Sequence, residues 1–467
     1  MYTKDTLLFK ANNETSTSSM IADILHSFRS NERTFLLLKN VLGSFLIKGW
    51  SALVVLMMVP LTLKCLGVYQ NGVWLTISSL LVWIDQMDIG LGNGLRNKLA
   101  IYMAHGETEK ARQAVSSTMA MLIMIIAPML LLLLLLVWYG DVYGFLNVTP
   151  ELIPELRIAL LCAVTLVCLT FILKFIGNVY MGLQLPAVSN LLLSLGQTMA
   201  LLATWMLFIY GKATFFNVVV VNVAAPLIIY LISYPYTFWL KYPELRPSIS
   251  FVNLPTALQL GNLGLKFFWL QVASIIQFMT ANILISKFFT PAMVTPYQIS
   301  YRYLSLVIVG FTVICMPFWN ATTDAYTRGD IAWIERASHK MNILTFFILL
   351  LLIFMTFISP YIYQLWIGED CYVPFSMTAL MAIYIFLLVL SMRYSYFLNG
   401  VGALRLQLYM TIMAIIFIPL AWVVSRASHN ITYFLVVMCL CNIPGIIVNI
   451  IQFNKIIKGR AYGIWRV

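Results

Sequence analysis

The chain has 467 residues, of which 61% are hydrophobic and only 10% are charged. Soluble domains carry about 25% charged residues, so a soluble fold of this length could not bury so much apolar surface. The net charge of +12 is spread over short connections between apolar runs, which excludes a nucleic-acid-binding surface and indicates a membrane protein.

Apolar runs recur along the chain, and each is near the length of about 20 residues that a membrane-spanning helix needs. Ahead of them, Ile21, Ile24, Leu25 and Phe28 recur at helical spacing, which predicts either a helix on the membrane surface or an extension of the first span. The predicted spans cover residues 40–63, 72–92, 115–138, 157–179, 187–210, 215–239, 262–286, 295–317, 341–363, 375–397, 406–425 and 431–452.

Basic residues fall mainly on one side of these spans. If the spans alternate from a cytoplasmic N-terminus, 21 of the 29 lysines and arginines lie in cytoplasmic segments and five lie outside. Positive charge is retained on the cytoplasmic side of membranes. The pattern therefore predicts an even number of spans with both termini in the cytoplasm.

The chain also repeats itself at an offset near 220 residues. An extended cytoplasmic loop over 94–116 with a turn at Gly106 matches a loop over 320–339 with a turn at Gly329, and Gly182 matches Gly402. We predict an all-α integral membrane protein of two pseudo-symmetric six-helix lobes, an architecture typical of transporters. The predicted segments are an N-terminal tail (1–35), a first lobe (36–240), a linker (241–258), a second lobe (259–453) and a basic C-terminal tail (454–467).

No catalytic or metal motif is present. The four histidines are isolated from one another, and Gly90-x-Gly92-x-Gly94 follows an apolar helix instead of the strand that a dinucleotide-binding motif requires. The external connections are too short to hold the active site of a glycosyltransferase or polymerase. We therefore predict that the chain is not an enzyme and uses no cofactor.

A charged residue inside a span costs about 2.5–3.5 kcal/mol, and five such residues are candidates for a functional role. They are Lys48, Asp85, Asp88, Lys174 and Arg302. The two aspartates share a helix face and could couple transport to an ion. The alternatives are a structural Lys48–Asp85 pair, a helix-capping role for Asp88 and a snorkelling Lys174.

The three cations suit an anionic substrate, because a pyrophosphate that crosses a membrane needs lysine or arginine to offset its charge. Lys48, Lys174 and Arg302 are the predicted substrate-binding residues. The predicted cavity lining, which could equally be interhelical hydrogen-bonding residues, comprises Gln271, Gln277, Asn282, Gln298 and Tyr301.

One segment resembles a known family. Trp83-Ile84-x-x-x-Asp88-Ile89-Gly90-Leu91-Gly92-Asn93-Gly94-Leu95-Arg96-Asn97-Lys98-Leu99 is similar to the second helix and following loop of bacterial polysaccharide flippases of the Wzx type. Gly182-Leu183-Gln184-x-Pro186 and Asn399-Gly400-Val401-Gly402 add to the likeness. The family belongs to the multidrug/oligosaccharidyl-lipid/polysaccharide exporter superfamily, and its likeness marks Asn93, Gly94, Arg96 and Asn97 as a cytoplasmic loop motif.

The resemblance implies a MATE-like, V-shaped pair of lobes in the bacterial inner membrane. It implies a flippase for undecaprenyl-pyrophosphate-linked oligosaccharides in O-antigen, capsule or exopolysaccharide assembly, driven by H⁺ or Na⁺. The partners would be the lipid-linked oligosaccharide and the bilayer, with the polysaccharide polymerase and chain-length machinery as further candidates. A multidrug or small-molecule cation antiporter of the same fold is the alternative, and a membrane glycosyltransferase or polymerase is a more distant one.

Overall fold

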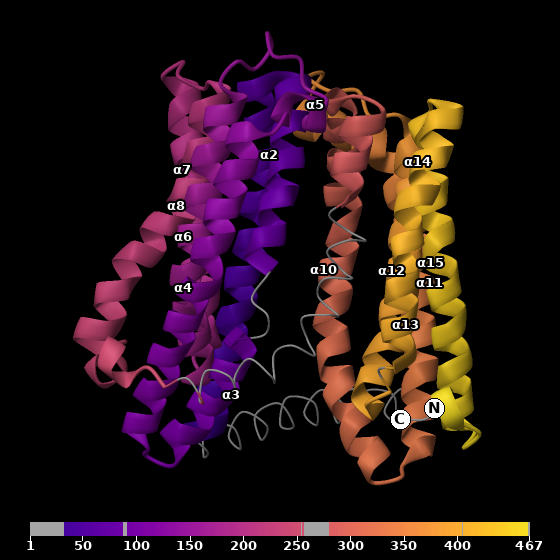
Figure 1. The fold of residues 1–467 in the computed structure, drawn as a ribbon. Coiled ribbons are helices and arrows are strands. Elements are labelled where there is room, and N and C mark those ends of the chain that lie inside the picture. The colour runs from indigo at the N-terminus through magenta and orange to yellow at the C-terminus, as the bar shows by residue number, and fades with distance from the viewer. Residues whose placement is uncertain (1–31, 87–90, 254, 256–279, 404, 466–467) are drawn as a thin grey trace, which may run out of the picture.

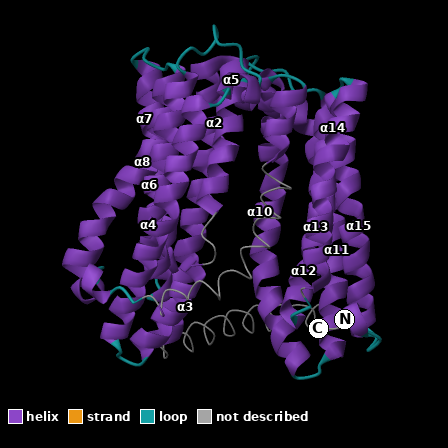
Figure 2. Ribbon diagram, in the orientation of Figure 1, coloured by secondary structure: helices purple, strands orange, loops and turns teal. Residues whose placement is uncertain are grey.

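The computed structural model describes residues 32–86, 91–253, 255, 280–403 and 405–465, and every regular element in these ranges is helical (Figure 2). The first group of helices comprises α2 (Glu32–Gln86), α3 (Leu91–Ala104), α4 (Thr108–Tyr139), α5 (Val142–Leu146), α6 (Leu156–Gly182), α7 (Pro186–Ile209) and α8 (Phe215–Pro235), followed by the short turns η1 (Tyr236–Lys241), η2 (Pro243–Leu245) and η3 (Ile249–Phe251). The second group comprises α10 (Pro291–Thr327), α11 (Ile331–Ile367), α12 (Phe375–Val401), α13 (Arg405–Met413), η4 (Ala414–Ile416), α14 (Phe417–Ser428), α15 (Ile431–Ile457) and η5 (Gly463–Trp465).

The two groups form two lobes, which lie closest together at the end where α5 is found and diverge toward the other end (Figure 1). Each lobe has its own apolar core: Phe175 is central to the first, and Phe311 and Phe434 to the second. Helix α2 belongs to both, because its Leu63 and Leu75 pack into the second core. The predicted all-α fold of two helical bundles is confirmed.

Nine helices within the described ranges are long and apolar enough to cross a membrane. In α4, the leucine run leaves Leu131, Leu132, Leu135 and Leu136 exposed, as expected of a helix whose outer face contacts lipid. The chain is therefore a multi-pass membrane protein.

Four predicted spans differ from the observed helices or lie largely outside the described residues. The spans at 40–63 and 72–92 are continuous in α2, whose backbone leaves helical geometry at Gly67 (φ 66°), a conformation that glycine adopts without strain. The span at 406–425 is divided among α13, η4 and α14. Most of the span at 262–286, and all of the predicted surface helix near Ile24, lie outside the described residues.

The predicted loops after the second and eighth spans are helical, with only tight turns at their centres. At Gly106 (φ 72°), Glu107 N–H donates to Tyr102 O and Gly106 N–H to Met103 O, at 2.9 and 3.3 Å. At Gly329 (φ 76°), 223 residues later, Asp330 N–H donates to Ala325 O and Gly329 N–H to Tyr326 O, at 2.9 and 3.1 Å. The same helix-ending motif therefore recurs in both lobes.

The ends of α6 and α12 also correspond, but the structure corrects the predicted pairing of glycines. Leu185 N–H donates to Tyr180 O as Ala403 N–H donates to Leu398 O, which gives an offset of 218 residues. Gly182 therefore corresponds to Gly400 and not to Gly402. Gly402 instead occupies the left-handed position after the helix (φ 86°), which Gln184 takes in the first lobe (φ 61°).

Both of these glycines allow two helices to approach closely. A β-carbon at Gly182 would lie 3.0 Å from Leu99 Cβ of α3, and one at Gly400 would lie 3.1 Å from Thr322 Cβ of α10. The contacted residues, Leu99 and Thr322, are 223 positions apart, which is the offset of the turns at Gly106 and Gly329. Small residues let backbones approach closely in membrane-helix packing.

We expect Gly400→Leu to lower the free energy of unfolding by about 1–3 kcal/mol, because the added atoms overpack the α10–α12 contact. Unfolding of the purified protein in mixed micelles measures the change. Gly49→Leu is the matched control, since no neighbour lies within 4 Å of a β-carbon there. Equal stability of the two variants would contradict the close-packing role of Gly400.

Candidate functional site

A polar patch lies at the seam where α2 of the first lobe packs against α10 of the second. Gln298 and Arg302 are one turn apart on α10, inside the apolar span Pro291–Cys315. A small cavity of about 10 Å³ lies beside them, lined also by Val59, Thr62, Asn71, Leu75 and Ile299. This is about the volume that one water molecule needs, so the two helices are closed against each other at this seam.

A chain of amide hydrogen bonds crosses the seam. Gln298 Nε2 donates to Asn282 Oδ1 at 2.7 Å, and Asn282 Nδ2 donates to Leu75 O of α2 at 3.2 Å. Asn71 Nδ2 lies 3.4 Å from Thr295 Oγ1, whose hydroxyl donates to Val68 O at 2.8 Å.

Arg302 is the cation of this patch. It is partly buried, no carboxylate is among the residues that line the cavity, and no ion pair of Arg302 is found within the described part of the chain. The Oδ1 atom of Asn71 is buried without a hydrogen-bond partner. A positive charge and an unused polar atom thus share one seam between the lobes, which suits a hydrogen-bonding anion.

The structure brings together three of the predicted site residues: Asn282, Gln298 and Arg302. It adds Thr62 and Asn71, which sequence reasoning missed because both lie at the ends of predicted spans. In the structure α2 continues through these positions, and both side chains are buried.

The other two predicted cations are not placed at this seam. Lys48 is exposed on α2, and Lys174 is partly buried on α6 of the first lobe, where it takes part in an interaction. Tyr301 packs against the core of the second lobe. The side chains of Asp85 and Asn93, and the whole of Asp88, Gln271 and Gln277, lie outside the described residues.

The predicted cytoplasmic loop motif is part of a helix. Gly94 is buried in α3, while Arg96 and Asn97 are exposed. Leu95 and Leu99, on the opposite face, are fully buried in the core of the first lobe. The segment therefore packs as an amphipathic helix against its lobe.

Arg393 is one of the 21 charges assigned to the cytoplasmic side, although its position falls in the predicted span 375–397. It lies two turns inside α12 and is only 6% exposed. Its Nη2 donates to Ser338 Oγ at 3.1 Å and to Ser338 O at 3.4 Å, and its guanidinium lies 4.6 Å from the ring centre of Tyr394. The apolar residues that follow, such as Phe397 and Leu398, were the signal that the helix continues. Its contacts hold α11 and α12 together.

The lobes are joined at the α5 end by contacts between residues far apart in sequence. Asn147 Nδ2 donates to Ser286 O at 3.0 Å, and Ser286 Oγ donates to Leu146 O at 2.7 Å. A β-carbon at Gly72 would overlap the carbonyl group of Pro291, so only glycine allows α2 and α10 to lie this close. This end of the molecule is closed in the conformation seen here.

One further contact across the lobes depends on a proline. Pro60 has no N–H, so the helical partner of Leu56 O is missing in α2. Trp366 Nε1 of α11 donates to this carbonyl at 3.1 Å. The indole therefore completes the hydrogen bonding of a helix in the other lobe.

We expect Trp366→Phe to lower the free energy of unfolding by about 1 kcal/mol, because Leu56 O then has no donor. The loss should be smaller in a Pro60→Ala background, where a backbone N–H is restored. A double-mutant cycle measures this coupling from the unfolding of the wild type, the two single variants and the double variant in mixed micelles. Trp205→Phe, at an exposed position of α7, is the control. The same loss in both backgrounds would refute the role assigned to Trp366.

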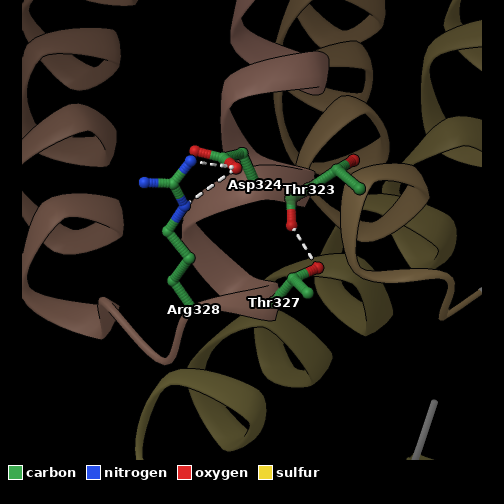
Figure 3. Close-up of polar contacts among 4 residues, drawn as sticks. All are labelled: Thr323, Asp324, Thr327 and Arg328. Carbon is green, nitrogen blue, oxygen red and sulfur yellow. Dashed lines mark hydrogen bonds and ion pairs between the residues drawn. The ribbon is translucent and has the colours of Figure 1, made fainter.

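At the opposite end of α10, polar contacts are local and exposed (Figure 3). Arg328 Nε and Nη2 each lie 3.0 Å from Asp324 Oδ1, and Thr327 Oγ1 donates to Thr323 O at 2.8 Å. Exposed pairs of this kind contribute at most about 1 kcal/mol. They complete a turn of the helix and are not part of the seam.

Comparison with known proteins places the fold. No protein-family model and no curated protein matches the sequence. The inward-facing conformation of a multidrug resistance MATE family transporter of the MOP superfamily matches with a TM-score of 0.72 at 15% identity, over 88% of this chain and 95% of that chain. An outward-facing conformation of such a transporter gives 0.55 at 14% identity, over 89% and 97%.

A third match is a MOP superfamily transporter from Pyrococcus furiosus, for which a reverse polarity of the binding pocket suggests a different function. Its TM-score is 0.55 at 14% identity, over 89% of this chain and 97% of that chain. The chain therefore has the fold of MATE transporters of the MOP superfamily, in an arrangement nearer to the inward-facing than to the outward-facing structure.

Proposed function

We propose that the chain is an alternating-access flippase for an anionic, lipid-linked head group, the undecaprenyl-pyrophosphate-linked oligosaccharide of surface polysaccharide assembly. The observation that carries this proposal is Arg302, a cation inside a membrane span, beside neutral amides and at the seam of two lobes. A guanidinium offers paired donors to phosphate oxygens. The fold supports the mechanism, since similar structures are described in inward-facing and outward-facing conformations.

In this mechanism the α5 end opens while the opposite end closes, so the seam becomes accessible from the other face. The hydrogen bonds of Asn147 and Ser286 would break in that step, as would the contact between Gly72 and Pro291. The positive-inside pattern supports a cytoplasmic position for the open end, so the head group would move from the cytoplasmic to the periplasmic leaflet. A gradient of H⁺ or Na⁺ would drive the cycle.

A multidrug cation antiporter is the second candidate, favoured by the description of similar structures as multidrug transporters. Cationic drugs need acidic or aromatic groups for binding. None of the residues that line the seam cavity is acidic, and Arg302 would repel a cation. The Pyrococcus protein illustrates that pocket polarity differs among transporters of this fold.

The experiment compares both substrates in one preparation. The purified chain is reconstituted into vesicles with a fluorescent undecaprenyl-pyrophosphate-linked oligosaccharide, and transfer between leaflets is followed by protection from a membrane-impermeant quencher, with an imposed H⁺ or Na⁺ gradient. Efflux of ethidium from matched vesicles is measured in parallel. We expect transfer of the lipid-linked sugar without ethidium efflux, and the reverse result would overturn the proposal.

A further inference from the structure

A second cavity, formed in part by the same two helices, is not explained by head-group binding. It has a volume of about 430 Å³, within the range of about 300–1,000 Å³ that small-molecule sites occupy. Helix α2 of the first lobe forms one wall, and α10 and α11 of the second lobe form the other. We define the apolar groove by six of its lining residues, which are Leu53, Leu56, Met57, Pro60, Tyr303 and Trp366.

The walls of the apolar groove present only hydrocarbon to an occupant. Its two polar side chains are already engaged: Trp366 Nε1 donates to Leu56 O and Tyr303 OH donates to Met355 O, each at 3.1 Å. A drug-like ligand with hydrogen-bonding groups would find no partner there. A saturated or polyprenyl chain, which needs none, fits this chemistry.

The apolar groove also opens sideways, inside a membrane-spanning segment. Leu53 and Met57 are 53% and 56% exposed, and both lie in the span that begins at Leu46. Where such a segment faces the bilayer, the surrounding medium is lipid hydrocarbon, and a lipid chain could enter the groove from there without crossing water.

The apolar groove and the polar seam adjoin along both helices. On α2, Val59 lines the seam cavity while Pro60 lines the groove; on α10, Arg302 lines the seam cavity while Tyr303 lines the groove. A ligand with a charged end and a hydrocarbon end matches this pairing of surfaces.

We infer that the apolar groove holds the first part of the hydrocarbon chain of an anionic polyprenyl lipid whose pyrophosphate lies against Arg302. This rests on the proposed function and adds to it the site of the chain. Transfer of a chain from lipid into a protein groove gains little from the hydrophobic effect, because the surrounding lipid is equally apolar. The hydrocarbon chain therefore contributes to binding through close packing, and the charge at Arg302 selects lipids with an anionic head group.

The test compares two ligands that share a head group. Undecaprenyl pyrophosphate and methyl pyrophosphate, which has no chain to reach the groove, are bound to the full chain in nanodiscs, and each dissociation constant is measured by thermophoresis. In the wild type we expect the long chain to bind about tenfold more tightly. Leu53→Trp with Met57→Trp fills the groove and should reduce this ratio to about one, with the affinity for the short ligand unchanged.

The matched control is Leu131→Trp with Leu135→Trp, which adds the same bulk to the lipid-facing side of α4 and should keep the ratio. A photoreactive polyprenyl pyrophosphate gives a second measurement on the unmodified chain, with labelling expected at Leu53–Pro60 and Tyr303 and lost in Arg302→Gln. An unchanged ratio in the groove variant would overturn the inference, as would equal competition by phosphatidylglycerol, which would show an ordinary lipid there. If the wild type binds neither ligand, the proposed function itself fails.

Discussion

Arg302→Gln is expected to reduce transfer of the lipid-linked oligosaccharide by about 10- to 100-fold, the effect of removing one charge-assisted pair of hydrogen bonds to a phosphate. Glutamine keeps a polar side chain of similar length, so the change isolates the charge. Arg302→Lys should lie between the two, because lysine keeps the charge but lacks the planar fork of donors. Initial rates in reconstituted vesicles, normalised to protein amount, measure the effect.

Arg328→Gln is the matched control for this experiment. Arg328 directly follows the last residue of α10, but its side chain is 73% exposed and forms an ion pair with Asp324 (Figure 3). Its loss should change the rate by less than about twofold. Wild-type transfer by Arg302→Gln at equal protein levels would remove the main support for an anionic substrate at the seam.

Gly72→Val is expected to have the second large effect, on the conformational cycle. A β-carbon at Gly72 meets the backbone of Pro291, which cannot rotate away as a side chain could, so α2 and α10 must separate at the α5 end. Overpacking of a fixed contact costs about 1–3 kcal/mol or more, which shifts a two-state equilibrium by about fivefold to over a hundredfold. The closed arrangement at this end should therefore become the minor state.

Spin labels at the exposed positions Leu152 and Met293, in a background without native cysteines, report the separation of the lobes at this end. We expect Gly72→Val to lengthen and broaden the distance distribution and to slow transport at least about tenfold. Gly310→Val is the control, because a β-carbon at Gly310 meets no atom within 4 Å. A wild-type distance distribution in Gly72→Val would show that this contact does not govern closure.

The inferred site for the hydrocarbon chain and the proposed site for the head group can be tested separately. Changes at Arg302 should weaken binding of long and short pyrophosphates alike. Changes at Leu53 and Met57 should affect only the long ligand. Together the two sets of variants separate recognition of charge from recognition of the hydrocarbon chain.

Several features of the protein follow from local sequence alone. Apolar runs of spanning length predict helices because a backbone in lipid must satisfy its own hydrogen bonds. Gly106 and Gly329 predict the turns that end α3 and α10, since a left-handed residue is needed there. Arg302 is predicted to be functional because the insertion of a charge within an apolar run costs free energy.

Other features were decided only by tertiary packing. The partners of buried polar groups depend on neighbouring helices, which is why Arg393 of α12 donates to Ser338 and why Thr62 and Asn71 are buried within α2. The repeat offset near 220 residues was visible in the sequence, but the equivalence of Gly182 with Gly400 depends on which glycine touches a neighbouring helix.

A membrane-spanning helical chain with a cation at Arg302 is predictable from the amino-acid order, because helix formation and membrane insertion depend on local composition. The groups that surround this cation are known only from the folded chain. The seam joins Asn71 and Leu75 to Asn282 and Gln298, more than 200 residues later in the chain. Such contacts depend on how two separately packed lobes dock against each other, and no local sequence pattern predicts them.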